Sequence, residues 1–74
     1  MVEDDRKPGL NPLAGDVLER TTAAGAVMRR TVTEVSGKTI VYAAQRNGKD
    51  SGGGQCFIST WQEWAAKATV VNKA

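Results

Sequence analysis

Histidine is absent from this chain of 74 residues, and cysteine occurs only once, as Cys56. Without histidine the chain lacks the commonest general base near neutral pH, the usual zinc ligand, and any Ser-His or Cys-His nucleophile pair. A single cysteine can form neither an intramolecular disulfide nor a cysteine-rich metal site. We therefore expect no catalytic residue, no metal and no cofactor, and the lone thiol favours a cytoplasmic location.

Long apolar runs are also missing. No stretch reaches the roughly 18 apolar residues that would span a membrane. The first ten residues, MVEDDRKPGL, lack the apolar core of a signal peptide. We expect no membrane association, and the length allows one domain at most.

Charge is distributed unevenly along the chain, whose net charge is +2. Residues 1–19 carry five acidic and two basic side chains, which gives −3, whereas residues 20–74 carry eight basic and three acidic ones, which gives +5. A basic body suggests nucleic acid or another acidic partner, although an ordinary solvated surface can show the same imbalance. The basic side chains singled out as candidate binding residues are Arg20, Arg29, Lys38, Arg46 and Lys49.

Two breaks divide the chain into a leader and a body. Pro8-Gly9 and Asn11-Pro12 interrupt any periodicity, so residues 1–14 are predicted to be a flexible acidic and polar leader, and residues 15–74 a single domain. Alternating patterns rich in valine and threonine predict strands at residues 17–21, 26–35, 38–45, 55–58 and 69–71.

Local details add a bulge, a turn and two opposed arginines. Val32 and Val35 fall on opposite parities, so a bulge at Thr33–Glu34 is predicted to return Val35 to the buried side. Ser36-Gly37 predicts a tight hairpin. Arg29 and Arg30 are adjacent in a strand and therefore point to opposite faces, with Arg29 expected on the outer one.

The segment RNGKDSGGG, residues 46–54, has the composition of a loop. A nucleotide-binding phosphate loop needs its lysine and serine after the glycines, followed by a helix. Here Lys49 and Ser51 precede the glycines and a strand is expected to follow, so the order does not fit a nucleotide-binding loop. We expect a mobile loop whose Arg46 and Lys49 can touch a phosphate.

A short helix is predicted to begin at Ser59, because Ser59 and Gln62 have the spacing of a capping box. Its apolar stripe contains both tryptophans of the chain. We expect Trp64 in the core and Trp61 partly exposed beside it, where Trp61 can stack a base or anchor a protein. The alternative is that both tryptophans fill the core.

The order of elements predicts a mainly β fold: an SH3-like small antiparallel barrel of about five short strands with one short C-terminal helix. The alternative is a meander of three or four strands with a packed helix.

The stretches GDVLER, RRTVTEVSGKTIVYA and CFISTWQEWA, spread over about residues 15–71, resemble small, mostly uncharacterised prophage-type proteins with an SH3-like barrel. The resemblance implies a mobile-element origin and a small barrel but no activity. The glycine-rich segment and the acidic leader depart from its outline.

These observations predict a non-catalytic binding module. The first hypothesis is association with nucleic acid or a nucleoprotein complex through basic side chains of the outer strands. The alternative is a protein-interaction module, such as a phage-encoded modulator of a host protein, that holds its partner in a groove lined by Tyr42 and Trp61. Val41, Ala43 and Phe57, expected on an outer face, favour a homodimer.

Overall fold

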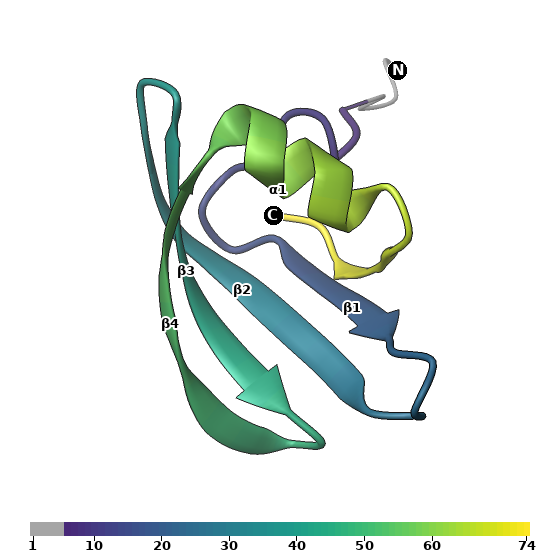
Figure 1. Ribbon diagram of the computed structural model, residues 1–74. Coiled ribbons are helices and arrows are strands. Elements are labelled where there is room, and N and C mark those ends of the chain that lie inside the picture. The colour runs from purple at the N-terminus through teal and green to yellow at the C-terminus, as the bar shows by residue number, and fades with distance from the viewer. Residues whose placement is uncertain (1–5) are drawn as a thin grey trace.

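The computed structural model describes residues 6–74 as one antiparallel sheet of five strands with a single helix on one face (Figure 1). The strands lie in the order β4-β3-β2-β1-β5. This confirms the prediction of five antiparallel strands and one helix ahead of the last strand. The elements are β1 (Val17–Thr21), β2 (Val27–Ser36), β3 (Thr39–Arg46), β4 (Lys49–Phe57), α1 (Ile58–Ala65) and β5 (Thr69–Asn72).

The sheet is open and does not close into a barrel. β4 and β5 form its two edges, and within residues 6–74 they do not pair with each other. The closing strand predicted near residues 69–71 is present as β5, and it pairs with β1, with Val70 opposite Leu18. The last strand of the chain therefore lies beside the first.

The predicted bulge in β2 is confirmed. The register between β2 and β3 shifts between Val32 and Glu34, so that Val35 pairs with Ile40. Val35 packs against the core cluster as a result. An extra residue in one strand changes the parity of everything after it, which is why both Val32 and Val35 can face the same side.

The prediction of a loop over residues 46–54 is wrong. Asn47 and Gly48 have φ values of 51° and 81°, as a two-residue hairpin turn requires, and β4 begins directly after them at Lys49. The glycines pair with β3, Gly53 opposite Ala43 and Gly54 opposite Tyr42. Their low strand propensity misled the sequence interpretation, because a neighbouring strand that offers a full hydrogen-bonding ladder overrides propensity.

The helix begins one residue earlier than predicted, and the expected capping box is not formed. Phe57 occupies the N-cap position of α1 and makes no side-chain capping hydrogen bond. The side chain of Gln62 instead donates to the carbonyl of Leu10, at 3.0 Å. A tertiary contact has thus replaced the local one that the spacing suggested.

The core shows that the predicted roles of the two tryptophans are reversed. Trp61 is fully buried, at 0% exposure, whereas Trp64 is half-buried at the margin of the core. The indole Nε1 of Trp61 donates to the carbonyl of Pro8 at 3.0 Å, so its polar atom is satisfied inside the protein. The buried cluster consists of Leu18, Val32, Ile40, Trp61 and Ala65.

The N-terminal segment was predicted to be a flexible leader, but the part that the structure describes packs against the body. Pro8 and Pro12 are buried. Residues 1–5 of the predicted leader lie outside the described residues. The segment packs because hydrogen bonds to Asp16 hold it against the body, and its partners meet only in the folded chain.

Asp16 ties three segments together. Its carboxylate is fully buried and accepts two hydrogen bonds from the guanidinium of Arg6, at 2.6 and 2.9 Å. It also accepts from the backbone N–H of Leu13 at 2.7 Å and of Ala74 at 2.8 Å. Burial raises the pKa of Asp16, but Arg6 and these N–H donors outweigh it and hold that pKa below its usual value.

Candidate nucleic-acid interface

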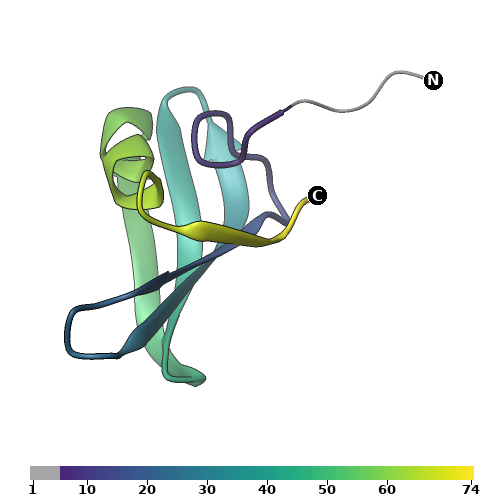
Figure 2. The ribbon, with the colours of Figure 1, turned by 90° about the vertical axis from the view of Figure 1, so that its right-hand side faces the viewer.

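The face of the sheet that carries α1, here called the inner face, is only partly covered by the helix. Seen from the side, the hairpin of β1 and β2 runs out below α1 (Figure 2). The core side chains Leu18, Val32 and Ile40 fix which residues share this face, because alternate residues of a strand point to the same side. The uncovered end of the inner face is therefore built from the strand ends next to the two lower hairpins.

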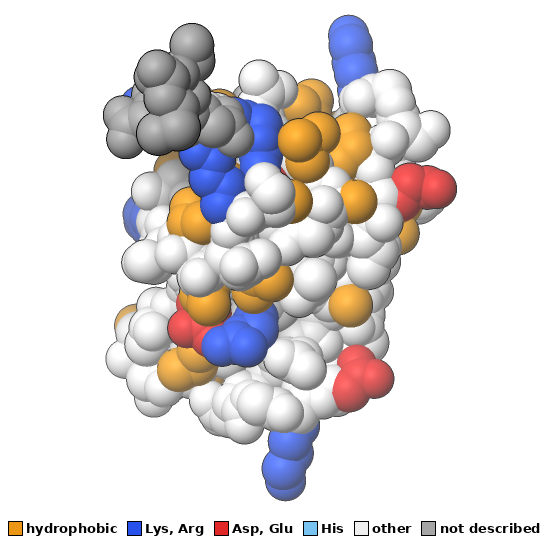
Figure 3. All heavy atoms as spheres, turned by 180° about the vertical axis from the view of Figure 1, so that it is seen from behind, with side chains coloured by type: hydrophobic (Ala, Val, Ile, Leu, Met, Phe, Trp, Pro, Cys, Tyr) orange, Lys and Arg blue, Asp and Glu red, His pale blue; other side chains and the backbone are white. Residues whose placement is uncertain are grey.

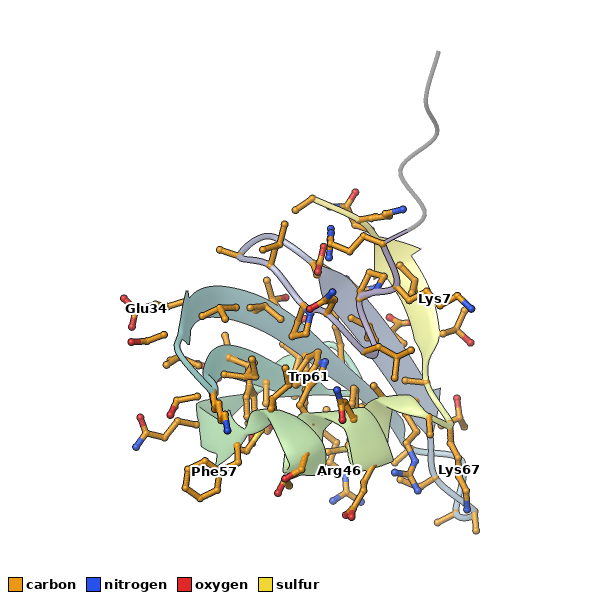
Figure 4. All side chains as sticks on the ribbon, turned by 90° about the horizontal axis from the view of Figure 1, so that it is seen from above. Lys7, Glu34, Arg46, Phe57, Trp61 and Lys67 are labelled. Carbon is orange, nitrogen blue, oxygen red and sulfur yellow. The ribbon has the colours of Figure 1, made fainter. Side chains whose placement is uncertain are left out.

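A row of long side chains crosses this uncovered end. Arg20 in β1 pairs with Met28 in β2, Met28 pairs with Arg46 in β3, and Arg46 pairs with Lys49 in β4. Directly paired residues present their side chains to the same face, so three cations share one row about 14 Å wide, three strand spacings. The view from above places Arg46 on the helix side of the sheet (Figure 4).

Arg30 lies one step further up β2 on the same face, next to the helix. Its guanidinium carbon is 4.4 Å from the centre of the Tyr42 ring and 4.3 Å from that of Trp64. Each contact is within the range of a cation–π interaction. We call Arg20, Arg30, Arg46 and Lys49 together the cationic patch.

The cationic patch is not neutralised by its surroundings. Among residues 6–74 the two ion pairs join Arg6 to Asp16 and Arg29 to Glu19, and neither involves the patch. Two carboxylates adjoin the patch in sequence. Glu19, next to Arg20, pairs with Arg29, and Asp50, next to Lys49, pairs across the sheet with Gln45 on the other face and accepts from the N–H of Gly52. The four positive charges therefore have no acidic partner within ion-pair distance in the described part of the chain. Arg46 and Lys49 are exposed, whereas Arg20 and Arg30 are half-buried and the Nη1 of Arg20 donates to the carbonyl of Trp64 at 3.5 Å.

Two of the predicted binding residues lie elsewhere, so the predicted cluster on the outer strands is wrong. Arg29 is on the outer face, as expected, but its Nε donates to Glu19 at 2.7 Å. Lys38 lies in the turn between β2 and β3, at the opposite end of β3 from Arg46. Seen from behind, the outer face shows scattered charges of both signs among uncharged side chains (Figure 3).

The predicted groove lined by Tyr42 and Trp61 is also absent, because Trp61 has no exposed surface. Tyr42 and Trp61 contact each other inside the protein, with ring centres 6.1 Å apart. Trp61 can neither stack a base nor touch a partner in this fold. Tyr42 stays at the site in another role, as one of the two rings that hold Arg30.

A pocket of about 250 Å³ opens at the other end of β4, near the start of α1. It contains no charged side chain; its lining is Thr39, Gln55, Cys56, Phe57 and Thr60. Burial raises the pKa of the Cys56 thiol, and the charge of Arg30 only partly offsets this. At neutral pH the thiol is therefore protonated, which makes it a poor nucleophile.

The remaining chemistry of the described residues is limited. No group of three or more potential metal ligands occurs in residues 6–74. No helix in this range is long and apolar enough to cross a membrane. The carboxylates of Asp16 and Glu19 each pair with a different arginine, Arg6 and Arg29.

No known protein family, curated protein or solved structure matches the chain. The resemblance to prophage-type SH3-like barrels therefore stays a prediction. The site has to be interpreted from its own geometry.

Sequence reasoning missed two residues of the site, Arg30 and Trp64. The parity of β2 already placed Arg30 on the inner face with Met28 and Val32. The contacts of Arg30 with two aromatic rings could not be predicted, since Tyr42 and Trp64 lie 12 and 34 residues away along the chain. An inward-pointing arginine in a strand was the signal that could have directed attention to the aromatic residues.

Proposed function

We propose that this protein is a non-catalytic module that binds the phosphate backbone of nucleic acid through the cationic patch. The observation that carries the proposal is the continuous pairing of Arg20, Met28, Arg46 and Lys49 across four strands, with Arg30 beside it. Cations held in a row on a sheet surface match the regular negative charges of a nucleic-acid strand.

The arrangement of the cations lowers the stability of the protein without a ligand, and this supports the proposal that the patch binds one. Arg46 and Lys49 are direct cross-strand neighbours, and like charges in that position destabilise a sheet. Nothing in the core depends on either side chain, as both are exposed at the end of a hairpin. A polyanion bound across the row would relieve this repulsion.

The test is a titration of fluorescein-labelled oligothymidylate and of a labelled duplex, followed by anisotropy at about 50 and 200 mM salt. The double variant Arg46→Ala with Lys49→Ala is expected to lose affinity about tenfold or more and to lower the salt slope by about 1–2. The matched control, Arg29→Ala with Lys38→Ala, removes the same charge from outside the patch and is expected to change affinity by less than about threefold.

Equal losses in the two double variants would mean that overall charge, and not the patch, drives association. Absence of binding at low salt would remove nucleic acid as the ligand. The protein-interaction alternative would then lead, with its surface beside Phe57, which is 68% exposed and lines the pocket at the other end of β4.

A further inference from the structure

We infer that Arg30 is a pre-oriented phosphate ligand and that the cationic patch binds the sugar-phosphate backbone without stacking bases. This inference rests on the proposed function and specifies what is recognised. It is carried by the position of Arg30 between two rings and by the locations of all the aromatic side chains in the chain.

The guanidinium of Arg30 is held in place by aromatic contacts, but its N–H groups donate no hydrogen bond to the described residues. Its carbon lies 4.4 Å from the centre of the Tyr42 ring and 4.3 Å from that of Trp64, so the group is in contact with both rings. Within residues 6–74 no hydrogen bond or ion pair involves its N–H groups. Every buried side-chain nitrogen and oxygen in residues 6–74 has a hydrogen-bond partner. Because the nitrogens of Arg30 have none, they must be accessible to solvent.

Such an arginine suits phosphate well. Stacking uses the faces of the guanidinium and leaves the N–H bonds in its plane free to donate to two oxygens at once. The rings also remove most of the rotamer freedom that an exposed arginine loses on binding. Arg46 and Lys49 have no such support and act as solvated charges beside it.

The same contacts leave no ring available for a base. The chain has four aromatic residues. Tyr42 and Trp64 each have Arg30 over one face and each also packs against Trp61, with ring centres 6.1 and 5.6 Å from it. Trp61 is buried.

Phe57 is the remaining ring, and it is out of reach. It lies at the opposite end of β4 from Lys49, about 25 Å along the strand. Its strand neighbour Thr39 belongs to the outer face, so Phe57 points away from the patch. Binding should therefore follow the number of phosphates and be indifferent to the identity or presence of bases.

The experiment compares a labelled oligothymidylate with an abasic oligonucleotide of the same length, with the wild-type protein and two lysine variants. The wild type is expected to bind both probes within about threefold, since one stacked base would add about fivefold or more. Arg30→Lys, which keeps the charge but loses the planar fork, is expected to weaken both probes about tenfold. The matched control Arg46→Lys, an arginine without stacked rings, is expected to weaken them less than threefold.

The outcomes separate this inference from the proposed function. Wild-type protein that binds neither probe would overturn the proposed function itself. Binding of oligothymidylate more than about fivefold tighter than the abasic probe would leave the function standing and overturn backbone-only recognition. Equal losses in the two lysine variants, with both folded by circular dichroism, would overturn the role of Arg30 while the charge model stands.

Discussion

The inner face of the sheet has two ends of opposite character. At the end under α1, apolar side chains from β1, β2 and β3 pack on Trp61, and the segment from Arg6 to Asp16 covers the indole. At the other end, below α1, these strands carry arginines and β4 carries Lys49, with no described acidic partner. One face of a single sheet thus changes from core to charged surface within a few residues.

The comparison shows where the fold and the proposed function are located. The covered end concentrates buried contacts whose removal leaves a cavity or an unpaired charge. The uncovered end contributes little to stability and holds like charges close together. Substitutions at the covered end should therefore reduce stability, and substitutions at the uncovered end should reduce binding.

The largest effect is expected for Trp61→Ala. Emptying the site of a fully buried tryptophan costs about 3–5 kcal/mol, a large share of the roughly 5–15 kcal/mol available to a small domain. Trp64→Ala, at the half-buried neighbour, should cost about 1–2 kcal/mol. Urea unfolding followed by circular dichroism measures both, and a larger loss for Trp64→Ala would reverse the assignment of the core tryptophan.

Asp16→Asn comes next, with an expected loss of about 3 kcal/mol. The substitution removes the buried negative charge that pairs with Arg6, whose side chain is only 13% exposed. The control is Glu19→Gln, which breaks the pair with Arg29, where the two side chains are 30% and 42% exposed; it should cost at most about 1 kcal/mol. Equal unfolding midpoints for the two variants would show that the Asp16 cluster does not hold the covered end together.

The same carboxylate predicts a pH dependence. The pKa of Asp16 is lower in the folded protein than its ordinary value of 3.8, so folding favours the ionised form. The stability that it contributes is complete above that value and is lost as the pH falls through the folded-state pKa. Wild-type urea midpoints should drop between about pH 5 and pH 2 by more than those of Asp16→Asn. Parallel curves would assign the acid sensitivity to other carboxyl groups.

Gly53→Ala tests the edge strand that spans both ends. A Cβ at Gly53 would lie 2.5 Å from the carbonyl oxygen of Tyr42 and 3.1 Å from the Cα of Ala43, so β4 must shift, at about 1–3 kcal/mol. At Gly54 the nearest atom would be the Tyr42 hydroxyl at 3.8 Å, an ordinary contact. Gly54→Ala is therefore the matched control and should change stability by less than about 1 kcal/mol. A mobile loop at this point would tolerate both changes equally.

The smallest effect on stability is expected for Arg46→Ala. Removing one of two opposed cations should leave the free energy of unfolding unchanged or raise it by up to about 0.5 kcal/mol. Together with the predicted loss of oligonucleotide binding, this result would separate the uncovered end from the core. A loss above about 1 kcal/mol would show that Arg46 has a structural role that its exposed position does not reveal.

Much of the sheet could be predicted from local patterns. Val17–Thr21 was predicted as a strand with its observed bounds, and the bulge after Val32 followed from the parity of two valines. Such features depend on residues a few positions apart. β4 could not be found in this way, because its glycines become a strand only through pairing with β3.

The site was predicted in part. Arg20, Arg46 and Lys49 were predicted as binding residues on outer strands and in a loop, but the fold brings them together on the inner face, whereas Arg29 and Lys38 are separated from them. Counting charges could not make this distinction. It requires the register of four strands, and a shift of one residue would send every side chain to the other face.

The sequence by itself determined a small, mainly β domain without histidine chemistry, with the hairpin between β2 and β3, the bulge and the single helix, because periodicity and turn residues act locally. Only the tertiary structure decided which tryptophan is buried, which arginine has an acidic partner and which is held between two rings. Those outcomes depend on neighbours from distant parts of the chain. Trp61 meets Pro8 from 53 positions earlier, and Arg30 meets Trp64 from 34 positions later, and only folding creates such contacts.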